Sequence, residues 1–136
     1  MAKLLIIDDT ENNRILLSRR LKPRGHKILL AEDAEKGLAI AKEQLPHLVL
    51  MDIGLPGMDG WEATRCLRAE PTLKGVIVIA LTAHAMAGGR DKAFAAGCDE
   101  YESKPINFPA LFEKIDALLA KQAESTASTS TPAQPT

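Results

Sequence analysis

The stretch Leu4-Leu-Ile-Ile-Asp-Asp9 places four branched apolar residues directly before two carboxylates. A run of this kind predicts a short strand buried on both faces, with its carboxyl end opening onto a polar loop. Three further apolar runs repeat the pattern along the chain, at 28–30, 48–51 and 76–81. Together the four runs predict a parallel sheet.

Helical patterns separate these runs, and a shorter fifth strand is expected at 100–103. We expect helices at 11–22, 34–44, around 60–67, at 91–96 and at 108–119, the last with apolar residues at i, i+3, i+4 and i+7. Pro23, Pro46 and Gly97 are typical of the ends of three of them. Strands that alternate with helices in this way predict a doubly wound α/β fold with right-handed crossovers and helices on both faces of the sheet.

Length and composition favour one domain. The chain has 136 residues, of which 46% are hydrophobic, and this is enough for a sizeable core. Its 17 basic and 18 acidic side chains give a net charge of -1, so we expect no direct binding to nucleic acid. We expect the folded domain to cover 1–121 and a flexible tail rich in Ser, Thr and Pro to cover 122–136.

The cysteines and the lengths of the apolar runs indicate the cellular compartment. Cys66 and Cys98 form neither a closely spaced metal pair nor a dense disulfide framework, which favours a reducing environment. No apolar stretch approaches the roughly 20 residues needed to span a bilayer, and no cleavable secretion signal is recognisable. The sequence therefore predicts a cytoplasmic protein without membrane insertion.

Three carboxylates follow two of the predicted strands. Asp8 and Asp9 come after the first strand and Asp52 comes directly after the third, so they should meet at one edge of the sheet. Like charges this close raise one another's pKa values, and a hard divalent cation removes the conflict. Mg²⁺ is the expected ion, because it accepts a few carboxylates and keeps positions for phosphate oxygens, and Mn²⁺ could substitute for it.

Two further strand ends supply a hydroxyl group and a positive charge. Thr82 and Ala83 follow the fourth strand, and Lys104 with Pro105 follows the fifth. A divalent cation, an ammonium group and a hydroxyl group around one carboxylate are what phosphoryl transfer requires, because its catalysis is mostly positioning and electrostatics. Asp52 would then be the nucleophile that forms an acyl phosphate.

These residues lie within longer motifs. The chain from residue 3 to about 121 resembles the receiver domain of two-component response regulators, whose flavodoxin-like fold has five parallel strands in the order 2-1-3-4-5. The motifs lean towards stand-alone and hybrid-kinase receivers. The matching segments are Ile6-Ile-Asp-Asp9, Met51-Asp-Ile-Gly-Leu-Pro-Gly-Met-Asp-Gly60, Leu81-Thr-Ala83, Gly97-Cys-Asp-Glu-Tyr101 and Ser103-Lys-Pro-Ile106.

The resemblance implies a role for each matching residue. It makes Asp52 the acceptor of a phosphoryl group from a phosphohistidine on a sensor histidine kinase or histidine phosphotransfer protein. It assigns Mg²⁺ to Asp8, Asp9, Asp52 and the Gly54 backbone carbonyl. It implies that Thr82, Ala83 and Lys104 contact the phosphoryl group and that Thr82 and Tyr101 form the switch. It also implies a cis Lys104-Pro105 peptide bond, and an influence of Gly54 and His84 on the rate of phosphate hydrolysis.

The resemblance also implies how the signal leaves the domain. The fourth helix, fifth strand and fifth helix would contact a downstream protein, and the chain would be a monomer, or a dimer on phosphorylation. Such a protein is not an enzyme acting on a separate substrate, since it catalyses only its own phosphorylation and dephosphorylation.

Other functions remain open at this point. A Mg²⁺-dependent phosphatase of the haloacid dehalogenase type also uses Asp, Thr and Lys, but expects Asp-x-Asp after the first strand, where this chain has Asp8-Asp9-Thr10. A flavin-binding protein fits the fold, although two aspartates repel phosphate in the absence of a metal. A phosphate-independent interaction module would keep the fold without the switch.

Overall fold

The computed structural model describes residues 2–83 and 89–130 of the chain. A single five-stranded sheet crosses this structure, and every pair of neighbouring strands is parallel. Its order, β2-β1-β3-β4-β5, confirms the predicted topology. The strands are β1 (Lys3–Ile7), β2 (Lys27–Ala31), β3 (Leu48–Asp52), β4 (Ile77–Thr82) and β5 (Glu100–Ser103).

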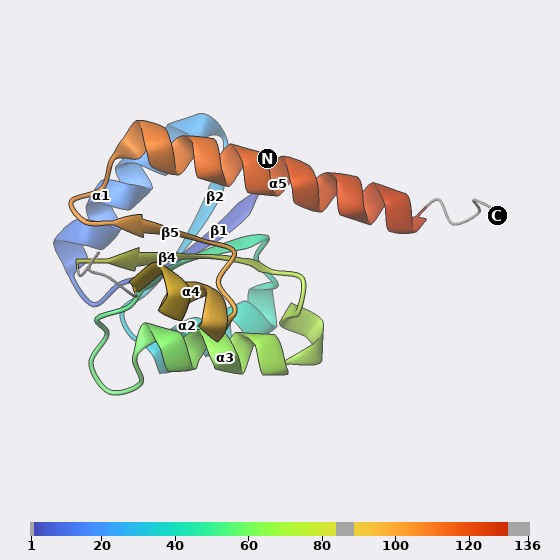
Figure 1. Ribbon diagram of the computed structural model, residues 1–136. Coiled ribbons are helices and arrows are strands. Elements are labelled where there is room, and N and C mark those ends of the chain that lie inside the picture. The colour runs from blue at the N-terminus through green and yellow to red at the C-terminus, as the bar shows by residue number, and fades with distance from the viewer. Residues whose placement is uncertain (1, 84–88, 131–136) are drawn as a thin grey trace.

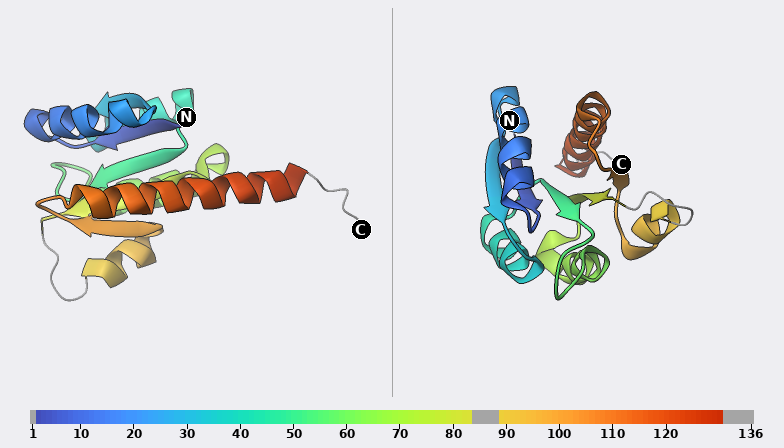
Figure 2. Two further views of the ribbon diagram at one scale, coloured as in Figure 1. Left: turned by 90° about the horizontal axis from the view of Figure 1, so that it is seen from above. Right: turned by 90° about the vertical axis from the view of Figure 1, so that its left-hand side faces the viewer.

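Helices cover both faces of the sheet, as the alternation predicts. Figure 1 and Figure 2 show α1 and α5 on one face, and α2, α3 and α4 on the other. α2 has the predicted bounds, whereas α1 ends one residue early and passes into a 3-10 turn that contains Pro23. The helices are α1 (Glu11–Leu21), α2 (Ala34–Gln44), α3 (Gly60–Ala69), α4 (Gly89–Ala96) and α5 (Phe108–Ser130), with 3-10 turns η1 (Lys22–Arg24) and η2 (Pro71–Leu73).

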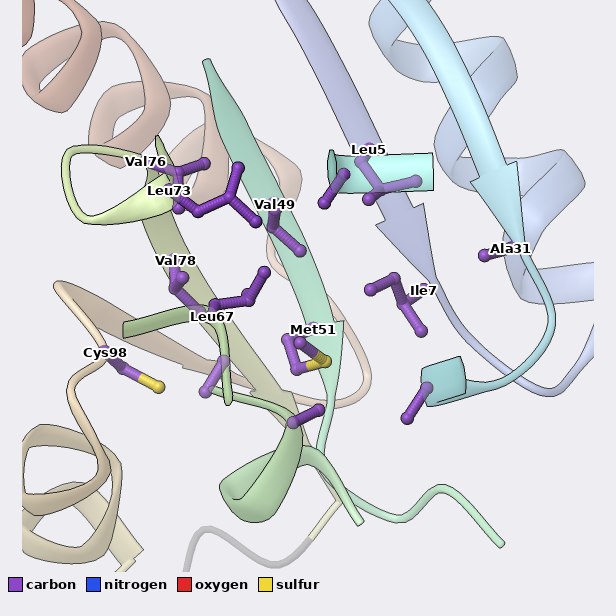
Figure 3. Close-up of a cluster of buried hydrophobic side chains, with 14 of the residues drawn as sticks. Leu5, Ile7, Ala31, Val49, Met51, Leu67, Leu73, Val76, Val78 and Cys98 are labelled. Carbon is purple, nitrogen blue, oxygen red and sulfur yellow. The ribbon is translucent and has the colours of Figure 1, made fainter. Parts of the chain in front are cut away.

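Two apolar clusters lie on the two faces of the sheet. Successive residues of a strand point to opposite faces, so Leu5 and Ile7 join the cluster under α2 and α3, while Leu4 and Ile6 join the cluster under α1 and α5. Figure 3 shows the first cluster, in which Met51 lies between the side chains of neighbouring strands. The central strands are therefore buried on both sides, as the unbroken apolar runs predict.

The strand β2 differs from this prediction. It lies at the edge of the sheet, where Leu30 is 42% exposed and Leu29 is only half-buried. A run of apolar residues does not distinguish an edge strand from a central one, because the strand order decides how much of each face is covered. The expectation of burial on both faces was wrong for β2.

The helix α5 is longer than the sequence pattern indicates. It continues past Lys121 to Ser130, and Figure 1 and Figure 2 show its carboxyl-terminal part projecting beyond the rest of the domain. The boundary expected at 121 therefore lies inside a continuous helix, and the division into a domain and a tail stays a prediction. Over the residues that the structure describes, no helix has the length and apolar character needed to cross a bilayer.

Candidate functional site

The predicted polar residues meet at the carboxyl edge of the sheet. Asp52 and Thr82 are the last residues of β3 and β4, Asp8 and Asp9 follow β1, and Lys104 follows β5. One carboxylate oxygen each from Asp8, Asp9 and Asp52 lies within 4.8 Å of the others. Strands that run parallel end at the same edge, which is why residues so distant in sequence come together.

Lys104 lies between two of the three carboxylates. Its Nζ is 3.1 Å from Asp8 Oδ2 and 3.3 Å from Asp52 Oδ1. Asp8 is fully buried and Asp52 nearly so, whereas Asp9 is exposed. A single ammonium group therefore faces two buried carboxylates, and these three groups together carry a net charge of -1 when both acids are ionised.

The protonation equilibria reflect this imbalance. Burial raises the pKa of the Asp52 carboxyl group and the charge of Asp8 adds to the effect, although the Lys104 ammonium opposes it. Burial also disfavours the charged form of Lys104, but the two carboxylates outweigh it and the pKa of Lys104 is raised. Burial, with the charge of Asp8 as a smaller contribution, therefore outweighs Lys104, so the ion pair does not lower the pKa of Asp52.

Backbone hydrogen bonds restrain the positions of Asp52, Thr82 and Lys104. The Gly54 N–H donates to Asp52 Oδ1 at 3.1 Å, and the Lys104 N–H donates to the Thr82 carbonyl oxygen at 2.8 Å. The Lys104-Pro105 peptide bond is cis. The hydrogen bond between Lys104 and Thr82 therefore joins the residue directly after β5 to the end of β4, the strand next to Asp52.

The start of α3 packs closely against the end of β3. A Cβ atom added to Gly60 would lie 2.5 Å from the Asp52 carbonyl oxygen and 2.7 Å from Ile53 Cα. Asp59 caps the helix by accepting a hydrogen bond from the Glu62 N–H. The glycine is therefore required for the close approach between the helix and the loop after Asp52.

The structure describes two of the remaining predicted site residues, Ala83 and Tyr101. Ala83 is exposed after Thr82, and Tyr101 is half-buried in β5 and packs against the apolar cluster under α2, α3 and α4. His84 lies outside the described residues. The sequence reasoning missed Asn13 and Arg14, which both reach back from α1 to Asp8. Their distance from Asp8 along the sequence was the one available signal. It was a weak signal, because a loop separates Asp8 from α1 and its path cannot be predicted from the sequence.

The donor set suits a hard cation such as Mg²⁺. Three carboxylates within 4.8 Å of one another offer oxygen ligands only, and the described neighbours include neither a thiolate nor an imidazole in that group. The uncompensated negative charge is a second reason, because a divalent ion would balance it.

Comparisons with known proteins identify the family. The family model described as response regulator receiver domain matches residues 4–116. The chain belongs to the response regulator receiver family. This receiver is 34% identical over 120 residues to protein PilH of Pseudomonas aeruginosa, with 88% of this chain and 99% of that protein covered.

Two solved structures resemble this receiver over most of its length. One is the receiver domain of a sensor histidine kinase from Pseudomonas aeruginosa with a magnesium ion coordinated in its active-site cleft (30% identity, TM-score 0.81, covering 88% of this chain and 98% of the other). The other is a receiver of the response regulator Ssk1 from Saccharomyces cerevisiae, crystallised with the histidine phosphotransfer protein Ypd1 (31% identity, TM-score 0.83, covering 89% and 90%).

The family assignment decides between some of the alternatives. A receiver of two-component regulatory systems is neither a dehalogenase-type phosphatase nor a flavin protein, so those two hypotheses are set aside. A phosphate-independent interaction module uses the same fold, and only an experiment on the acceptor residue separates it from a working receiver.

Proposed function

We propose that this receiver is the phosphoacceptor of a two-component or phosphorelay system, with Asp52 as the residue that is phosphorylated. The observation that carries the proposal is the position of the Asp52 carboxylate, nearly buried between Lys104, Asp8 and the Gly54 N–H. A phosphoryl group that reaches this nucleophilic carboxylate would find an ammonium group and hydrogen-bond donors already positioned around it.

Each neighbour has a defined part in the transfer. Asp52 attacks the phosphorus atom, the bond to the phosphohistidine nitrogen breaks, and the phosphoryl group becomes an acyl phosphate on Asp52. Lys104 pairs with the new phosphate charge, and the Thr82 hydroxyl and the Ala83 N–H donate to its oxygens. Asp8, Asp9, Asp52 and the Gly54 carbonyl would hold Mg²⁺, or Mn²⁺ in its place. When bound, the ion would supply positive charge to the transferring oxygens.

The same contacts provide the switch. A phosphoryl group brings about two negative charges, and these bias the position of Thr82 at the end of β4. Tyr101 lies opposite Ala80 on the neighbouring strand and is half-buried, so its side chain can follow a movement of Thr82. The domain catalyses only its own phosphorylation and dephosphorylation, and Gly54 and His84 would influence the latter.

Exposed side chains on α1 support a protein as the donor. α1 begins two residues after Asp9, and its Ile15 and Leu16 are 40% and 45% exposed. Neighbouring exposed apolar residues on a helix are typical of a protein-binding surface. The donor would be a sensor histidine kinase or a histidine phosphotransfer protein, and the free thiols of Cys66 and Cys98 fit work in a reducing cytoplasm.

The output surface would be formed by α4, β5 and α5. Lys114 on α5 donates to the Tyr101 carbonyl oxygen and pairs with the Glu102 carboxylate, each at 2.7 Å, so that α5 is tied to the switch strand. Phe94 on α4 is 39% exposed. A downstream protein that binds this surface would sense Tyr101, and the receiver would act as a monomer or would dimerise when phosphorylated.

Incubation with acetyl phosphate and Mg²⁺, followed by intact-mass measurement, tests the function. We expect the wild-type chain to gain one phosphoryl group and Asp52→Asn to gain none. Asp59→Asn is the matched control, because it changes a carboxylate in the same loop but keeps an oxygen that can cap α3. Equal addition to Asp52→Asn, or none to the wild type, would favour the phosphate-independent module.

A further inference from the structure

We propose that Asn13 is a positioning residue that holds the Asp8 carboxylate in the orientation needed to bind Mg²⁺. The inference rests on the proposed function, because it assumes that Asp8 is a metal ligand. Its basis is a pair of contacts from the Asn13 side-chain amide to both carboxylate oxygens of Asp8, each at 3.4 Å. An amide nitrogen equally distant from the two oxygens restrains both of them at once.

The other contacts of this carboxylate show which oxygen position a metal can take. Oδ1 accepts a hydrogen bond from the Thr10 N–H at 2.9 Å, and Oδ2 pairs with Lys104 Nζ at 3.1 Å. A carboxylate has about four lone-pair positions, and Thr10, Asn13 and Lys104 use them all. The backbone N–H and the short Asn13 side chain cannot withdraw easily, whereas the long Lys104 side chain can.

Mg²⁺ would therefore replace Lys104 at Asp8. When the ammonium leaves, the Thr10 N–H and the Asn13 amide are the contacts that keep the carboxylate oriented. Oxygen ligands of Mg²⁺ must meet near-octahedral geometry, so a loosely held carboxylate binds the ion poorly. Groups that hydrogen-bond to metal ligands commonly change metal affinity by 10–100-fold when they are removed.

The start of α1 places Asn13 for this purpose. Asn13 lies in the first turn of α1, where its N–H donates to the Thr10 carbonyl oxygen. The next residue, Arg14, donates to the backbone carbonyl oxygen of Asp8 at 2.7 Å. Two consecutive helical residues thus hold the side chain and the main chain of Asp8. Asp9 makes no hydrogen bond or ion pair within residues 2–83 and 89–130, so it is the adjustable ligand of the pair.

The test compares Mg²⁺ affinity in matched variants. Mg²⁺ is titrated into the purified chain without a phosphodonor, and the NMR shifts of the Thr10 and Gly54 amides report binding, because these N–H groups donate to Asp8 and Asp52. We expect about tenfold weaker binding for Asn13→Ala. Asn12→Ala is the control, since Asn12 is the exposed neighbour on the same helical turn, and its affinity should stay within about twofold of the wild type.

Further variants separate positioning from a purely structural role. Asn13→Leu keeps a side chain of similar volume without the amide donors, and its Mg²⁺ affinity should fall as much as that of Asn13→Ala. It also provides the test if Asn13→Ala does not fold. Asn13→Gln keeps an amide and should regain most of the affinity. Circular dichroism and urea unfolding without Mg²⁺ check that all three variants are folded under the conditions of the titration. Unchanged affinity in Asn13→Ala or Asn13→Leu, or an equal loss in Asn12→Ala, overturns the proposal.

Failure of this inference differs from failure of the proposed function. If the wild-type chain shows no saturable Mg²⁺ response, the metal site itself is wrong and the positioning role is wrong with it. If the wild type responds and Asn13→Ala responds equally, the metal site stands and only the role of Asn13 is overturned.

Discussion

The two ends of the five-stranded sheet are held by different kinds of contact. At the carboxyl end, the buried carboxylates of Asp8 and Asp52 share the ammonium group of Lys104. At the amino end, a hollow of about 720 Å³ is lined mainly by apolar side chains, and the polar side chains of His26, His47 and Gln122 also line it. Buried carboxylates are concentrated at the carboxyl end, whereas side-chain hydrogen bonds to backbone carbonyl groups hold the opposite end.

Hydrogen bonds to backbone carbonyl groups hold the amino end together. The Gln122 side chain donates from α5 to the carbonyl oxygens of His47 and Gly75, each at 3.1 Å. Arg68 donates from α3 to the carbonyl oxygens of Gly97, Lys74 and Val76, and it pairs with Asp99 at 2.8 Å. These contacts join helices to the segments that precede β3, β4 and β5. A divalent cation should therefore compensate for charge-removing variants at the carboxyl end and not for variants at the amino end.

The largest expected effect is at the charged end. Lys104→Met leaves Asp8 and Asp52 buried without a cation, which should cost about 3 kcal/mol of unfolding free energy in the absence of metal. Mg²⁺ should restore much of this loss, because it replaces the missing charge. Urea unfolding with and without saturating MgCl₂ measures both effects.

Lys114→Met is the control for the charged end. Lys114 also pairs with a buried carboxylate, that of Glu102, but lies outside the metal cluster. We expect a loss of stability that Mg²⁺ does not restore beyond its effect on the wild type. Equal rescue of the two variants would contradict the proposed metal site.

A smaller, metal-independent loss is expected at the amino end. Arg68→Ala removes a donor from three carbonyl groups and removes the cation paired with Asp99, which keeps the hydrogen bond from the Val78 N–H, and we expect a cost of about 2 kcal/mol. Arg65→Ala removes an exposed arginine from the same helix and should stay within about 0.5 kcal/mol of the wild type. A metal-dependent loss in Arg68→Ala would mean that the two ends are coupled.

The thiol of Cys98 reports opening of the amino end. Burial raises the pKa of Cys98 from 9.0 to about 11, so at pH 8 only about one molecule in a thousand carries the thiolate. We expect iodoacetamide to modify the exposed Cys66 at least about tenfold faster than Cys98 at pH 8. Peptide mass spectrometry over time measures both rates.

The pH dependence of Cys98 has a definite sign. A raised pKa means that the folded chain holds the proton more tightly, so this contribution to stability is complete below pH 9 and is lost as the pH rises towards 11. Modification of Cys98 should therefore accelerate as the pH rises from 9 to 11. It should also be faster in Arg68→Ala, where the amino end is less stable. Equal rates for both cysteines at pH 8 would show that the amino end opens readily.

The smallest effect concerns the end of α5. Gln122→Ala removes two hydrogen bonds at an exposed position and should cost about 1 kcal/mol. Lys121→Ala, which changes the preceding residue of the same helix, should have little effect. Thermal unfolding of both variants checks this, and equal midpoints would mean that Gln122 does not hold α5 to the amino end.

Much of the charged end could be predicted from the sequence, because its parts follow apolar runs directly. The strands of this sheet run parallel, so Asp8, Asp52, Thr82 and Lys104 had to meet at one edge. The sequence could not show which residue of the Asp8-Asp9 pair is buried. That depends on how α1 leaves the strand, and the contact from Asn13 depends on the same turn.

The amino end was less predictable for a related reason. Arg68 and Gln122 donate to carbonyl groups, which every residue carries, so no side-chain pattern marks their partners. The continuation of α5 to Ser130 was also missed, because Ser and Thr are weak helix formers and gave no helical signal. The exposure of Leu30 depends on strand order, which local periodicity does not contain.

The ion pair between Asp8 and Lys104 joins residues that are 96 positions apart. During synthesis, Asp52 at the end of β3 emerges long before the lysine that balances its charge leaves the ribosome. A nascent or partly unfolded chain in which β5 has not docked would therefore lack the complete site. Anything that binds only the complete site also stabilises the whole fold by mass action. Occupancy of this receiver by a ligand or phosphoryl group would thus report on the integrity of the entire chain from β1 to β5.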